Sequence, residues 1–175
     1  LNDLAPLSDS DTLVTLFDDT EIQVSHEKLT EILYDNISEI ITQVDVIVMA
    51  CTGYEEMGNY QKPILFPGKI TENLIVDYSN KKDFKLGVVQ PHSNQIKKEF
   101  EKWNSMNIVA DVYASSPYGN GNVSADQSWI DVKNSFDQFN PDLVYLNCMG
   151  MSSAHKDYIH ENLNVPVLLA ANVTG

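Results

Sequence analysis

Hydrophobic residues recur along the chain in two patterns, which alternate from one end to the other. Apolar side chains at helical spacing run from about His26 to Gln43 and predict one long amphipathic helix. Continuous apolar runs at 44–50 and 85–90 are typical of parallel strands that are covered on both faces. Because helix and strand patterns alternate throughout, the chain is predicted to form a doubly wound α/β fold.

Turn and cap signals divide the chain into further elements. Strands are predicted at 12–17, 21–25, 44–50, 85–90, 108–113, 143–147 and 167–170. The first two form a hairpin around Asp18-Asp19-Thr20, after which Ser25 is placed to cap the first helix. The other helices are predicted at 71–78, after His92-Ser93-Asn94 with Ile96, Phe100 and Trp103 on the inner face, around Trp129, Val132, Phe136 and Phe139, and after Ser152.

A lysine-rich break at 81–83 is the one candidate for a boundary between lobes. We therefore predict a first lobe at 1–82 and a second lobe at 83–166, with 167–175 rejoining the first. The two halves share the order strand, cysteine, turn, helix. This shared order raises the question of whether the two cysteines act as a pair.

The composition is that of an acidic globular protein. A formal charge of −14 at pH 7 would repel nucleic acid and anionic lipid, so neither is an expected partner. All 11 basic residues are lysines, and the bidentate fork of arginine, which suits carboxylates, is missing. An anionic ligand must therefore be held by backbone N–H groups, hydroxyl groups or a lysine.

The two cysteines, Cys51 and Cys148, lie in apolar segments and do not form the pattern of a secreted disulfide framework. The sequence shows no signal-peptide pattern and no apolar run of about 20 residues. We therefore predict a cytoplasmic protein without a membrane partner. Because the chain starts at Leu1 and stops just after a predicted strand, we also expect it to be a fragment.

Both cysteines are predicted at the carboxyl ends of buried strands, where open α/β sheets bind their ligands. Each precedes a turn, Thr52-Gly53 or Met149-Gly150, whose small residues bring backbone N–H groups close to a ligand. Pro91-His92-Ser93 ends a third strand, and His155 lies in the first turn of the helix after Cys148. These residues are candidates for one crevice, where a helix N-terminus or a positive charge would lower the pKa of a thiol.

Simpler interpretations stay open for each candidate. A cysteine in an apolar strand is often an inert buried side chain. A zinc site is disfavoured, because the cysteines, His92 and His155 lack close ligand spacing. His155 is alternatively an exposed polar residue and His92 a helix cap, while His26 and His160 read as surface residues. The turn-rich loop at 115–122 is either a lid or a plain turn.

Four segments form a familiar set: TLVTLFDDTEIQVSHEKL, DVIVMACTG, KLGVVQPHSNQ with Trp103 following, and DLVYLNCMGMSSAHKD followed by VPVLLA. Their order and spacing cover nearly the whole chain and are more specific than any single motif. Together they resemble the AroM family, which is related to the aspartate/glutamate racemase superfamily. The resemblance implies two pseudo-symmetric, Rossmann-like α/β lobes with mainly parallel sheets and a cleft between them.

The resemblance also implies a site. In the wider superfamily, two cysteines from opposite lobes face each other across a bound amino acid or related carboxylate, without a cofactor. By position, Cys51 and Cys148 match this pair, so one would take the α-proton and the other would return a proton to the opposite face. Thr52, Ser93 and Asn94 match the hydroxyl and amide groups that contact the substrate carboxylate. A homodimer is an expected assembly.

The chain departs from the pattern of the superfamily after the second cysteine. Met149-Gly150 stands where racemases commonly have Thr-His, and the nearest histidine is His155, which leaves the substrate open. The opening strand of the family, with its Gly-Gln and Pro-Arg signature, and its last helix do not occur in these residues. We predict a cofactor-independent racemase- or isomerase-like enzyme for a small carboxylate or amino acid. The alternatives are a single-thiol decarboxylase or isomerase and a non-catalytic carboxylate sensor.

Overall fold

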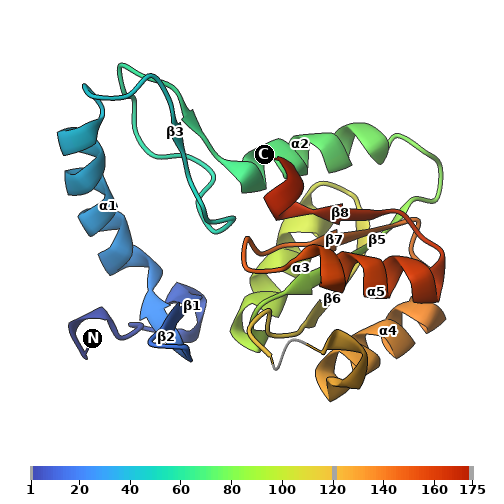
Figure 1. The fold of residues 1–175 in the computed structure, drawn as a ribbon. Coiled ribbons are helices and arrows are strands. Elements are labelled where there is room, and N and C mark those ends of the chain that lie inside the picture. Colours follow the sequence, from blue (N-terminus) through green and yellow to red (C-terminus); the bar gives the residue numbers. More distant parts are fainter. Residues whose placement is uncertain (1, 120–121, 174–175) are drawn as a thin grey trace.

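Three separate sheets and five α-helices make up the computed structural model, which describes residues 2–119 and 122–173 (Figure 1). The largest sheet has four parallel strands in the order β6-β5-β7-β8. Their bounds are Lys85–Gln90 for β5, Val109–Ala114 for β6, Leu143–Leu146 for β7 and Val167–Leu169 for β8. The parallel α/β fold that the sequence predicts is therefore confirmed for this part of the chain.

Helices cover both faces of the four-stranded sheet, because successive strand residues point to opposite sides. On one face, Val88 packs with Ile75 of α2 (Pro67–Tyr78) and Trp103 of α3 (Ile96–Ser105). On the other face, Val89 packs with residues of α4 (Gln127–Phe139) and α5 (Ser153–Leu163). The four strands, and with them their carboxyl ends, are thus held between two packed layers of helices.

The N-terminal part begins with an antiparallel hairpin of β1 (Thr12–Phe17) and β2 (Thr20–Ser25), as predicted. Asp18 and Asp19 make its tight turn with φ values of 48° and 57°, a backbone region that aspartate tolerates better than most residues. Helix α1 (His26–Ile40) follows directly. The Ser25 hydroxyl accepts a hydrogen bond from the Lys28 N–H at 3.1 Å, which confirms the predicted cap.

The predicted buried strand at 44–50 is wrong in its length and its burial. Only Ile47–Val48 forms a strand, β3, which pairs in parallel with β4 (Ile64–Leu65). Val46 and Val48 are 45% and 44% exposed. A continuous apolar run predicts a strand that is covered on both faces, but β3 has a single neighbour strand, β4. The buried residues of the core cluster beside it are Ile37, Met49, Tyr54 and Met57, with partly buried residues around them.

Helix α3 packs Trp103 and Ile96 against the core as predicted, but Phe100 does not lie on its inner face. Trp103 is fully buried, but Phe100 is 43% exposed, and Glu99 is buried at 8% exposure. The spacing of apolar residues does not predict this, because the carboxyl group of Glu99 takes an inner position of the helix.

The C-terminal strand also differs from the predicted lobe assignment. Residues 167–175 were expected to rejoin the first lobe, but β8 pairs with β7 inside the four-stranded sheet. Helix α2, which falls in the predicted first lobe at 1–82, buries Ile75 against the same sheet. Residues 174 and 175 lie outside the described part. The boundary at 82/83 and the pseudo-symmetry of two lobes stay predictions.

Short 3₁₀ segments connect these elements: η1 (Asn2–Leu4), η2 (Asp9–Asp11), η3 (Ser93–Gln95), η4 (Val123–Ala125) and η5 (Ala170–Val173). Across the described ranges, no helix is both long enough and apolar enough to cross a bilayer.

Candidate active site

A pocket of about 140 Å³ lies where the hairpin, the turn after β3 and the carboxyl ends of β5 and β7 meet. Its wall includes the sequence-predicted residues Cys51, Thr52, Gly53, Pro91, Asn94, Cys148, Met149 and Gly150. Further wall residues are Thr12, Leu13, Val14, His26, Glu55, Gln90, Gln95, Lys98, Glu99, Lys102, Tyr118 and Asn147. The two cysteines, 97 positions apart in the chain (148 − 51), therefore share one cavity.

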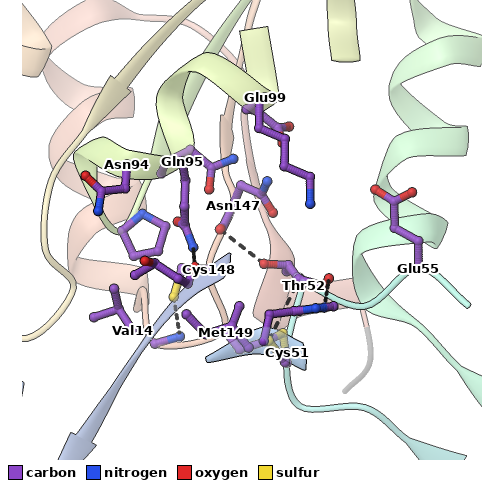
Figure 2. A pocket seen from close by; sticks show the side chains of 18 of the residues that line it. Val14, Cys51, Thr52, Glu55, Asn94, Gln95, Glu99, Asn147, Cys148 and Met149 are labelled. Atoms are coloured by element: carbon purple, nitrogen blue, oxygen red, sulfur yellow. Dashed lines mark hydrogen bonds between the residues drawn. The ribbon is translucent and has the colours of Figure 1, made fainter. Parts of the chain in front are cut away.

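The two thiols have the same local geometry. Each lies a little beyond its strand, since β3 ends at Val48 and β7 ends at Leu146. The Gly53 N–H donates to Cys51 Sγ at 3.4 Å, and the Gly150 N–H donates to Cys148 Sγ at the same distance (Figure 2). Both cysteines are free; Cys51 is half-buried and Cys148 is 9% exposed. Each sulfur is thus oriented by the backbone of its own turn.

Burial dominates the acidity of both thiols. It raises the pKa of Cys51, against a smaller opposing effect of the Gly53 N–H. Burial also raises the pKa of Cys148 to about 11, and negative charge on Cys51 adds to that shift. At both thiols, desolvation therefore outweighs the lowering of the pKa by backbone N–H groups. A charge on Cys51 therefore disfavours ionisation of Cys148.

A hydrogen bond joins the two cysteine turns directly. The Thr52 hydroxyl donates to the backbone oxygen of Asn147 at 3.2 Å. Asn147 is itself fixed, because the Tyr145 hydroxyl donates to its Oδ1 at 2.8 Å. The residue after Cys51 and the residue before Cys148 are therefore linked across the pocket.

Helix α2 also touches the first cysteine turn through a glycine. A Cβ added to Gly68 would lie 2.5 Å from the backbone oxygen of Thr52. Since neither backbone can move without disturbing the turn, we expect Gly68→Ala to lower the free energy of unfolding by roughly 1–3 kcal/mol. Urea denaturation measures this change.

Gly53→Ala is the matched control for that substitution. Its Cβ would meet Leu13 Cδ2 at 2.8 Å, and Leu13 is a flexible side chain that can turn away. Equal unfolding free energies for the two variants would contradict the close approach at Gly68.

His92 and Ser93 are not brought to the pocket wall. His92 Nδ1 accepts the Asn94 N–H at 3.2 Å, so its capping role is the one observed, and its Nε2 lies 3.0 Å from Gln23 Nε2. Ser93 is exposed at the start of η3. Only Asn94 of this trio lines the cavity.

His155 lies outside the pocket as well. Its Nδ1 accepts the Ser152 N–H at 3.0 Å, which caps α5, and its ring packs on Trp129 with centroids 4.7 Å apart. Burial lowers its pKa. It lines a second cavity with Ser152 and Asp126 and is buried rather than exposed. His26, read as a surface residue, is half-buried and lines the pocket, with Nε2 3.2 Å from the Gly53 oxygen.

Tyr118, Asn147, Gln95 and Glu99 are pocket residues that the sequence did not indicate. Tyr118 belongs to the loop predicted at 115–122, of which 120 and 121 lie outside the described residues. Its ring covers Gly150 so closely that an added Cβ would lie 2.9 Å from it. Of these four residues, Asn147 has a signal in the sequence that points to the pocket, since it directly precedes Cys148 at the end of a predicted strand.

The β1–β2 hairpin closes the pocket with Thr12, Leu13 and Val14. Among the described residues, four side-chain contacts join the hairpin and the preceding η2 segment to the loops of the large sheet. They are Gln95 Nε2 to the Thr12 oxygen at 3.0 Å, Asn94 Nδ2 to Asp9 Oδ1 at 3.3 Å, the Gln23–His92 contact, and the Ser116 hydroxyl to Glu21.

The chemistry available at the site is proton transfer. Among residues 2–119 and 122–173, no cluster of three or more His, Cys, Asp or Glu is arranged to hold a metal ion. The pocket holds two thiols, which are groups that can take up and release protons. The backbone N–H groups of Gly53 and Gly150 donate to the cysteine sulfurs, and an anion in the pocket would compete with the sulfurs for them.

Comparisons with known proteins agree with this architecture. A model of the AroM protein family matches residues 1–175. No curated protein sequence matches the chain. Among solved structures, the glutamate racemase isoform RacE1 from Bacillus anthracis has a similar fold, with a TM-score of 0.56 and 16% identity. The match covers 86% of this chain and 62% of the racemase, so the chain spans less than two thirds of that protein.

Proposed function

The chain belongs to the AroM protein family, as its sequence predicts, and from this premise we propose that it is a cofactor-independent racemase- or isomerase-like enzyme. Its substrate is a small carboxylate or amino acid, and its acid and base are Cys51 and Cys148. The observation that supports this proposal best is that two thiols from distant segments line one pocket, each oriented by its own turn. The fold that the chain shares with a glutamate racemase is consistent with it.

The thiol acidities support a division of roles. Inversion of a stereocentre needs a base on one face of the α-carbon and an acid on the other. In one direction the Cys51 thiolate takes the α-proton, and the electron pair of the C–H bond stays on the substrate. The Cys148 S–H then gives its proton to the opposite face, so that Cys148 becomes the thiolate. The reverse direction exchanges the two roles.

The surroundings of the thiols suit a carboxylate without an arginine. On binding, a carboxylate would take over the N–H groups of Gly53 and Gly150 from the two sulfurs and the Thr52 hydroxyl from the Asn147 oxygen. The Asn94 amide lies beside them at the wall. A carboxylate held in this way becomes a better proton donor at its α-carbon when the developing charge meets these donors. Ser93 and His155 have no place in this proposal, and the expected homodimer and cytoplasmic location stay predictions.

Deuterium exchange at the α-carbon tests the function. The protein is incubated in D₂O with D- and L-amino acids, including glutamate, and with small dicarboxylates, and loss of the α-proton signal is followed by NMR. We expect exchange together with inversion for at least one compound. A thermal-shift panel of the same compounds gives the counter-outcome, because binding without exchange would favour the carboxylate sensor.

A further inference from the structure

A buried carboxyl group lies in the pocket at a position that the thiol chemistry does not use. Glu99 of α3 is 8% exposed and lines the cavity. In the view of Figure 2 it lies across the pocket from Cys51. Burying a carboxylate is costly unless partners compensate for the lost water, so its inward position needs an explanation.

The partners of Glu99 occupy only one of its oxygens. Trp103 Nε1 donates to Glu99 Oε1 at 2.6 Å. Among the described residues, Oε2 receives no hydrogen bond. Because the residue lines the cavity, Oε2 is the group available to a ligand.

The nearby lysines are already engaged by other carboxylates. Lys102 contacts Glu55 and lies 2.9 Å from Glu72 Oε2. Lys69 contacts Glu72 at 2.5 Å. This cluster of Glu55, Glu72, Glu99, Lys69 and Lys102 holds three carboxyl groups and two ammonium groups. When Glu99 is ionised, the carboxylates of this cluster outnumber its ammonium groups by one, so a bound cation would balance the charge.

Burial raises the pKa of Glu99, and the nearby Lys102 and the Trp103 hydrogen bond oppose that shift only in part. Glu55 and Glu72 raise the pKa further. Lys98, the other lysine that lines the pocket, is exposed to solvent. A cation bound against Glu99 would favour the ionised carboxylate, and ligand binding would then release a proton.

We propose that Glu99 binds a primary ammonium group of the ligand, so that the pocket selects carboxylates that carry an amine over those that do not. This inference rests on the proposed function, because it needs the pocket to bind a small carboxylate. It is independent of whether the thiols catalyse a reaction there.

Glu99→Gln tests the inference with little change in structure, since the amide oxygen still accepts from Trp103. Binding is measured by calorimetry for two matched pairs: glutamate with 2-hydroxyglutarate, and lysine with 6-hydroxynorleucine. In the pair whose varied ammonium group contacts Glu99, we expect the substitution to weaken binding of the member that carries this ammonium about 10- to 100-fold and to leave binding of its hydroxyl counterpart within about twofold. The pair that responds identifies which ammonium group Glu99 contacts.

Proton release gives a readout that a purely structural role would not change. Wild-type enthalpies are measured over a pH series in buffers of different ionisation enthalpy. They are expected to show proton release at the pH values where Glu99 is protonated in the free protein, and Glu99→Gln is expected to abolish it. Glu101→Gln, an exposed carboxyl on the same helix, is the control and is expected to leave both measurements unchanged.

Equal binding of both members of each pair by the wild type would overturn the inference, as would tighter binding of the two hydroxyl members, 2-hydroxyglutarate and 6-hydroxynorleucine. Binding with discrimination but without α-proton exchange would overturn the proposed function and leave Glu99 in its role. Binding of no probe would overturn both.

Discussion

Replacing Cys51 or Cys148 by serine is expected to stop racemisation, with a rate loss of roughly 10²- to 10⁴-fold for either substitution. A serine hydroxyl ionises far less readily than a thiol, so it serves neither as the base nor as an efficient acid. Because each direction of the reaction uses both sulfurs, the losses should be similar for both enantiomers. Interconversion is followed by polarimetry from each pure enantiomer.

The two variants also show which thiol acts on which face of the α-carbon. A protein that keeps only its base can still exchange the α-proton without inverting the centre, so residual deuterium exchange should be confined to one enantiomer. Met149→Leu, at the same wall of the pocket, is a control that should keep racemisation. If one of the serine variants remains fully active, the two-thiol mechanism is excluded, and a single-thiol reaction becomes the better interpretation.

The rate should rise steeply with pH on the alkaline side. Burial raises the pKa of both Cys51 and Cys148, so only a small fraction of Cys51 is the reactive thiolate near neutral pH. That fraction grows about tenfold with each pH unit below its pKa, and we expect kcat/KM to grow in the same proportion between about pH 7 and 9. Cys148, with a pKa of about 11, stays protonated over this window.

Stability changes in the opposite direction and must be measured alongside the rate. A thiol whose pKa is higher in the folded than in the unfolded protein stabilises the fold fully below the unfolded value of about 8.5. That contribution is lost as pH rises toward the folded pKa. Near-UV circular dichroism at each pH separates the two effects. A rate that is flat or falls between pH 7 and 9, while the fold persists, would contradict a thiolate base.

The hairpin and the four strands of the large sheet were predictable from sequence, whereas the length and burial of the strand at 44–50 were not. The apolar run at 85–90 forms β5 as expected, since β6 and β7 flank it and helices cover both faces. The similar run at 44–50 has a single partner strand, so only Ile47–Val48 pairs. Hydrophobicity indicates that a segment favours burial, whereas the neighbours that provide burial are set by the rest of the chain.

Within the site, the sequence indicated the residues that follow strands and missed those that tertiary contacts bring in. Cys51 and Cys148 carry a local signal, a thiol before a glycine turn. Tyr118 and Glu99 carry none, because a loop tyrosine and a helical glutamate normally face water. His155 shows the reverse error, since its place at a helix start suggested the crevice while its ring packs on Trp129.

The hairpin over the pocket bears on how a ligand enters. β1 and β2 pair only with each other, and the contacts that fasten them and η2 to the large sheet are side-chain hydrogen bonds. Each such bond contributes about 1 kcal/mol, well below the global stability of a domain. Movement of the hairpin away from the pocket would break these bonds and uncover Leu13, but it would leave the backbone pairing of β5 with β7 intact. Ligand traffic through the pocket then requires no melting of its floor.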